Sequence, residues 1–140
     1  MPLAETVSLP HFTLAYWCVL AAVLLPIVCA GIAKSGKSGK AGSFDNHDPR
    51  AWLSRQQGVQ ARANAAQANS FENLPFFIGA VVIAHQLQAS QGWVDGLALA
   101  YIVLRMAYVA CYLANLASLR SLVYMLAFAA NIGLLFVGYR

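Results

Sequence analysis

The stretch FTLAYWCVLAAVLLPIVCAGIA, Phe12 to Ala33, decides the fold of this chain. It carries no charged residue over its 22 positions. A helix of that length crosses the hydrocarbon core of a bilayer, which is about 30 Å thick. The residues before it include Glu5 but no Lys or Arg, unlike the start of a cleaved signal peptide. The stretch therefore predicts a retained transmembrane helix.

The composition of the whole chain supports the same class. Apolar residues make up 60% of the 140 residues and charged residues only 10%, against about 45–50% and about 25% in ordinary soluble domains. A soluble domain this short has too little interior to hide so much apolar surface. The net charge of +4 does not indicate nucleic acid, because the basic residues lie between apolar segments. We expect membrane lipids as the surroundings and no nucleic-acid partner.

Three more segments of membrane length follow, at about residues 59–88, 93–116 and 119–137. With the first, at about 12–33, they predict a single all-α transmembrane domain over residues 1–140. Short second and third loops favour antiparallel neighbours, and hence a four-helix bundle. Residues 34–58 form a long polar loop, in which RAWLSRQQG suggests a short interfacial helix with Trp52 and Leu53 touching the membrane surface.

Basic residues are distributed unequally among the loops. The second loop and the N-terminal tail have none, whereas Arg120 adjoins the third loop. The positive-inside rule therefore predicts that the first and third loops are cytoplasmic and that both termini are outside, with Arg140 as the exception. The basic residues of the first loop are Lys34, Lys37, Lys40, Arg50 and Arg55.

The segment GIAKSGKS, Gly31 to Ser38, matches the Walker A pattern letter for letter. A phosphate-binding loop needs a strand before it and a helix opening at its Lys-Ser pair. Here a membrane helix precedes the motif, and the Gly- and Pro-containing GKAGSFDNHDP follows. We therefore expect no nucleotide site. The histidines and cysteines show no metal-ligand spacing, so no metal site is expected either.

Polar residues gather on one face of each later helix, and polar residues within a membrane indicate function by default. On the second helix four of them share an arc of about 100°: Arg62, Asn69, Glu72 and Asn73. The third helix carries a polar and aromatic stripe: Tyr101, Arg105, Tyr108, Tyr112 and Asn115. The fourth begins with Arg120, Ser121 and Tyr124.

Depth in the bilayer predicts which of these residues meet. Glu72 and Arg105 both lie roughly 15–20 Å from the cytoplasmic end, and pairing would offset the cost of burying each charge. We therefore predict a Glu72–Arg105 contact, with Asn69 near Tyr108 and Arg62 near Tyr112 or the third loop. Two interpretations stay open: a polar seam that joins helices, or a site for a charged, water-soluble ligand entering from the cytoplasm.

Three motifs in register resemble the MAPEG family, the membrane-associated proteins in eicosanoid and glutathione metabolism. The stretch RANAAQANSFENLPFF, residues 62–77, contains N-x-x-E-x-x-P, and two later patterns are R-x-x-[YH]-x-x-x-Y and R-S-x-x-Y. The resemblance covers the order, spacing and depth of all four helices, and the chain looks like a bacterial-type member. The motif residues are Asn69, Glu72, Pro75, Arg105, Tyr108, Tyr112, Arg120, Ser121 and Tyr124.

The resemblance implies a homotrimer in a bacterial inner membrane, with glutathione as co-substrate bound between subunits on the cytoplasmic side. It implies that Arg120 stabilises the glutathione thiolate and that Arg105 braces Glu72. The other residues it implies as glutathione contacts are Asn69, Glu72, Tyr108, Tyr112, Arg62, Ser121, Tyr124 and Lys34. Some members have arginines where this chain has Ala65 and Ala68, which leaves Arg62, Lys34 and Arg50 as candidates to replace them.

Two functions are consistent with this pattern. The first is a membrane glutathione transferase or peroxidase that acts on lipophilic electrophiles or hydroperoxides. The alternative is a non-catalytic lipid-binding or scaffold protein of the same family, which the absent arginines favour.

Overall fold

The computed structural model describes residues 11–36 and 42–139, and its regular structure there is helical, which confirms the predicted all-α class. The N-terminal tail, Lys37, Lys40 and Arg140, which entered the topology argument, lie outside the described residues. The helices are α1 (Leu14–Lys34), α2 (Pro49–Ser54), α3 (Gly58–Gln86), α4 (Gln91–Leu113) and α5 (Ala117–Phe136).

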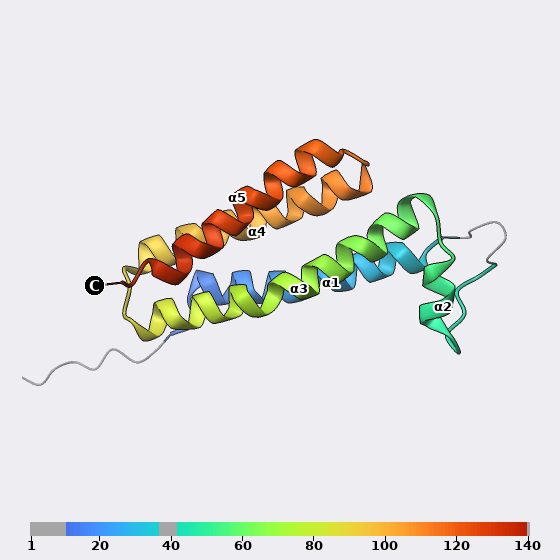
Figure 1. The fold of residues 1–140 in the computed structure, drawn as a ribbon. Helices are drawn as coiled ribbons and strands as arrows, with labels where there is room; N and C mark the ends of the chain where they lie inside the picture. The colour runs from blue at the N-terminus through green and yellow to red at the C-terminus, as the bar shows by residue number, and fades with distance from the viewer. Residues whose placement is uncertain (1–10, 37–41, 140) are drawn as a thin grey trace, which may run out of the picture.

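The four long helices run antiparallel in two pairs (Figure 1). Helix α1 packs chiefly against α3, and α4 packs chiefly against α5. Short α2 lies beyond the end of the α1–α3 pair, where α1 ends and α3 begins (Figure 1).

Two tight turns make the later helices antiparallel. After α4, Asn115 adopts a φ of +61°, and the amide of Leu116 donates to the carbonyl of Cys111 at 2.9 Å. After α3, Gln88 adopts a φ of +52°, and the amide of Ala89 donates to the carbonyl of Ala84 at 3.0 Å. Both are Schellman turns, which satisfy the last carbonyls of a helix and reverse the chain.

Small side chains dominate the core between the helices. Among the fully buried positions are Ala15, Ala63, Ala66, Ala80, Ala84 and Ala98. Small residues let helix backbones approach closely, as is typical of helix packing in membranes. Large apolar side chains instead face outward, and Trp17 and Ile27 of α1 are 58% and 57% exposed.

Within the described parts of the chain, three helices are long and apolar enough to cross a membrane: α1, α4 and α5. Helix α3 is the longest at 29 residues but is not among them, because the first half of its sequence, ARANAAQANSFEN, is polar.

In the loop between α1 and α3, Trp52 is only 1% exposed. The rings of Phe44 and Trp52 meet edge to face with centroids 5.3 Å apart, and Lys34 Nζ lies 4.7 Å from the centre of the Phe44 ring. The expectation that Trp52 touches the membrane surface is therefore wrong. The Trp52 side chain of α2 packs against Phe44 within the loop and does not face lipid.

Polar side chains close the opposite end of the bundle. Asp95 Oδ1 accepts hydrogen bonds from the amide of Ala15 at 2.9 Å and from Gln91 Nε2 at 2.8 Å. The Ala15 amide is in the first turn of α1, where backbone donors have no partner within the helix. Asp95 of α4 thus caps α1 from a neighbouring helix.

Candidate functional site

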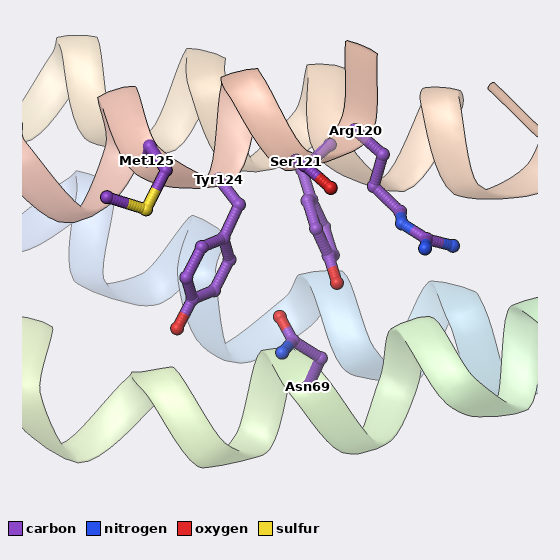
Figure 2. Close-up of a pocket in the computed structure, with 6 residues that line it drawn as sticks. Asn69, Arg120, Ser121, Tyr124 and Met125 are labelled. Atoms are coloured by element: carbon purple, nitrogen blue, oxygen red, sulfur yellow. The ribbon is translucent and has the colours of Figure 1, made fainter. Parts of the chain in front are cut away.

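A pocket of about 410 Å³ lies between α3, α4 and α5. Arg120, Ser121, Tyr124 and Met125 approach it from α5 and Asn69 from α3 (Figure 2). Ser121 and Met125 are exposed and Arg120 is half-buried, so the pocket opens at the surface of the chain. The residues that line it are Asn69, Tyr108, Arg120, Ser121, Tyr124 and Met125.

The α5 side of the pocket is the first two turns of that helix. Arg120 and Tyr124 are one helical turn apart, so both project toward the same side. The Ser121 hydroxyl donates to the carbonyl of Ala117 at 3.2 Å. The N-terminal turn of a helix carries a partial positive charge, which adds to the charge of Arg120 in this wall.

Arg105 organises the opposite wall. Its side chain is 3% exposed, and its Nη2 donates to Asn69 Oδ1 at 2.9 Å and to Ser70 Oγ at 3.4 Å. The guanidinium carbon lies 4.3 Å from the centre of the Tyr108 ring. Arg105 therefore joins α4 to α3 directly behind two residues that line the pocket.

Tyrosine rings in edge-to-face and tilted contact lie between the two arginines. The Arg120 guanidinium carbon lies 4.2 Å from the centre of the Tyr112 ring. The ring centroids of Tyr112 and Tyr108 are 5.6 Å apart, and those of Tyr108 and Tyr124 are 5.9 Å apart. Within residues 11–36 and 42–139, neither arginine forms an ion pair with a carboxylate. The pocket wall therefore carries positive charge that no acid of the described chain neutralises.

The predicted Glu72–Arg105 contact is wrong within the chain. Glu72 is exposed, and Arg105 instead bonds to Asn69 and Ser70. Depth in the bilayer placed Glu72 and Arg105 at the same level, but it does not fix the direction in which a side chain projects. Glu72 is three residues after Asn69, about 60° around the helix, and this rotation turns it away from α4. Arg105 thus does not brace Glu72.

Three other predicted residues lie outside the pocket lining: Arg62, Lys34 and Tyr112, whose ring instead contacts Arg120 and Tyr108. Arg62 Nε donates to the carbonyl of Leu113, the last residue of α4 before the third loop, at 3.1 Å, which confirms that Arg62 lies near Tyr112 or the third loop. Lys34 is exposed and packs over Phe44 in the first loop. The expected neighbourhood of Asn69 and Tyr108 is also confirmed, since both line the pocket.

Sequence reasoning missed two participants, Met125 and Ser70, and named Asn73 without assigning it a role in the site. Met125 lines the pocket, and its spacing of four residues from Ser121 was the available signal. Ser70 accepts from Arg105, but it falls outside the polar arc of α3 and gave no signal. Asn73 was within that arc; its Nδ2 donates to Asn69 Oδ1 at 3.3 Å and to the Asn69 carbonyl at 2.8 Å.

The pocket suits a small anionic or strongly polar ligand. Its volume is within the range of about 300–1,000 Å³ usual for small-molecule sites. Guanidinium, amide and phenol groups can donate hydrogen bonds to carboxylate or thiolate groups. Met125, which is 60% exposed, gives the rim an apolar edge.

Comparison with known proteins identifies one family. The model of the MAPEG family matches residues 14–139, nearly the whole chain. A search of curated proteins finds no match, and neither does a search of solved structures.

Proposed function

We propose, because the chain belongs to the MAPEG family of membrane-associated proteins in eicosanoid and glutathione metabolism, that it binds glutathione in the pocket at Arg120 and uses the thiolate on lipophilic substrates. Its membership and its three apolar helices make it an integral membrane protein. The proposed activity is glutathione transfer to lipophilic electrophiles, reduction of lipophilic hydroperoxides, or both.

The observation that carries this proposal is the convergence of Arg120 and Asn69, from two helices, on one pocket of about 410 Å³. Among the residues that the structure describes, Arg120 is held by the Tyr112 ring and by no carboxylate, so its charge is available to a ligand. Asn69 and the tyrosines Tyr108 and Tyr124 supply further hydrogen-bonding groups around it.

The proposed role of Arg120 is to favour the ionised thiol. A free thiol has a pKa of about 8.5 and is only a few per cent thiolate at pH 7. Lowering that pKa by about two units requires roughly 2.7 kcal/mol of differential stabilisation. One guanidinium in a partly buried wall can supply this, since two unit charges about 4 Å apart attract by about 4 kcal/mol at an effective dielectric constant of about 20.

The thiolate then attacks a substrate that arrives through the lipid. In transfer, a sulfur–carbon bond forms as the leaving group departs with its electron pair. In peroxide reduction, two glutathione molecules become a disulfide while the hydroperoxide becomes an alcohol and water. The exposed Met125 places the pocket rim beside the apolar outer surface of α5, which suits an apolar second substrate.

We further propose that α3 is a fourth transmembrane helix and that the protein is a homotrimer in a bacterial inner membrane, with the first loop cytoplasmic and the termini outside. An exposed stripe on α3 supports assembly: Ala68, Phe71, Glu72 and Pro75. A carboxylate facing lipid near the bilayer centre costs about 2.5–3.5 kcal/mol on insertion scales. A polar surface of a second copy would remove that cost and complete the ligand contacts of Glu72.

Binding and activity are tested with the purified protein in detergent or lipid. Isothermal titration with glutathione measures binding, and conjugation and peroxide-reduction assays with several apolar substrates measure activity. We expect the wild type to bind and to turn over at least one substrate class, and Arg120→Ala to be impaired. If neither the wild type nor Arg120→Ala turns over any substrate, and no glutathione binding is measured, the proposed enzymatic function is refuted.

One observation favours the alternative, a lipid-binding protein without catalysis. Two of the three basic residues expected to replace the arginines missing at Ala65 and Ala68 are engaged elsewhere, since Arg62 bonds to the Leu113 carbonyl and Lys34 lies over the Phe44 ring. Mass spectrometry of lipid that co-purifies with the protein distinguishes the two. A lipid that co-purifies in stoichiometric amount and is not displaced by added glutathione would support the alternative.

A further inference from the structure

The oxygen of the Asn69 carboxamide is occupied from behind the pocket. Arg105 Nη2 donates to it at 2.9 Å and Asn73 Nδ2 donates to it at 3.3 Å. A guanidinium has only donors, so the Asn69 atom that faces Arg105 must be the oxygen and not the nitrogen. Two donors use both lone pairs of that oxygen.

The other end of the carboxamide is therefore the part of Asn69 that a ligand can use. Asn69 lines the pocket (Figure 2), and within the described chain its Nδ2 donates to no other group. Without Arg105, the amide could rotate by half a turn and offer an acceptor instead.

We propose that Arg105 is a positioning residue that locks the Asn69 carboxamide with its NH₂ group toward the pocket, so that the pocket selects a ligand group that accepts hydrogen bonds there. The inference rests on the proposed function, because it assumes that the pocket binds glutathione. A carboxylate or a peptide carbonyl of glutathione satisfies this requirement, whereas an ammonium group does not.

Arg105 is itself fixed in a way that suits this role. Ser70 Oγ accepts from the same nitrogen at 3.4 Å, and the Tyr108 ring covers the guanidinium. Its Nη1 is buried without a partner in the described chain. Arg105 also borders a cavity of about 10 Å³ with Ser70 and Tyr101, which is about the size of one water molecule. A water there would hold the guanidinium from a further side.

The lock is tested without any ligand by NMR of the side-chain amide of Asn69 in ¹⁵N-asparagine-labelled protein in micelles. We expect Arg105→Met to shift and broaden the Asn69 resonances, and Arg105→Lys, which keeps a cationic hydrogen-bond donor, to restore them in part. A merely structural role would lower the melting temperature of Arg105→Met and leave the Asn69 resonances of the folded protein unchanged, and that result would overturn the proposal.

The selection is tested by titration with glutathione. Asn69→Asp replaces the NH₂ group by a second acceptor of the same shape, and we expect binding to weaken by about tenfold or more. The matched control is Asn64→Asp, the same change on the same helix at a residue that does not line the pocket; its binding should stay within about twofold of the wild type.

If Asn69→Asp binds glutathione as tightly as the wild type, the proposed selection for a hydrogen-bond acceptor at Asn69 is wrong. If the wild type does not bind glutathione, the proposed function fails, and the NMR result alone then supports or overturns the lock.

Discussion

The pH dependence of an Arg120→Gln variant tests the proposed chemistry most directly. Arg120 is half-buried at the pocket, and the Tyr112 ring, 4.2 Å from the guanidinium, does not neutralise its charge. If Arg120 lowers the thiol pKa by about two units, from about 8.5 to about 6.5, the bound thiol is about 75% ionised at pH 7. Without the guanidinium the ionised fraction falls to about 3%.

The sign and size of the effect follow from these fractions. The wild-type rate should rise with pH and level off above an apparent pKa of about 6.5, whereas the variant should level off above about 8.5. The defect in kcat at saturating glutathione is then about 25-fold at pH 7 and less than about 1.5-fold at pH 9. Glutathione conjugation followed from pH 5.5 to about 9.5 measures this, and ultraviolet absorbance of the thiolate measures the bound pKa directly.

A suitable control is Arg55→Gln, which removes an exposed arginine at the C-terminal cap of α2, away from the pocket. Its pH profile should match that of the wild type. A defect in Arg120→Gln that is equal at all pH values would show that Arg120 acts only in binding or folding. No defect at pH 7 would remove Arg120 from the chemistry altogether.

Three further predictions concern assembly and stability. Glu72→Leu should lower the yield of cross-linked trimer in membranes if a second copy covers Glu72, whereas Ile27→Leu, at an exposed position of α1 outside the α3 stripe, should not; equal yields would contradict the proposed assembly. Trp52→Ala should open the first loop, with a cost of up to about 3–5 kcal/mol, and limited proteolysis between residues 42 and 57 should quicken; unchanged protection would contradict its packing role. Asp95→Ala should lower the free energy of unfolding by about 1 kcal/mol, whereas Asp95→Asn, which keeps an acceptor for the Ala15 amide, should lose less; equal losses in micelles would show that charge and not capping matters.

The helical class and the membrane setting were predictable because they depend on sums over many residues. The uncharged run from Phe12 to Ala33 and the apolar total of the chain suffice for both. Composition does not determine the number of transmembrane helices, because α3 combines a polar half with an apolar half.

The site was predictable only in part, because contacts depend on how each helix is rotated about its axis. Helical spacing put Arg120, Ser121 and Tyr124 on one face, and all three line the pocket. Spacing and depth did not decide whether Arg105 meets Glu72 or Asn69, which lie about 60° apart on α3. The hydrogen bond between Arg105 and Ser70 could not be predicted either, because it depends on the conformation of the long Arg105 side chain.

The polar first half of α3 has a consequence for how the chain enters the bilayer during synthesis. Insertion machinery releases a segment sideways into lipid according to its apolarity, and α1 qualifies alone whereas α3 does not. On the proposed topology, α3 must therefore stay at the insertion machinery until another helix shields its polar face. Helix α1 is already made and packs along α3, so the two should leave the machinery together as a helical hairpin.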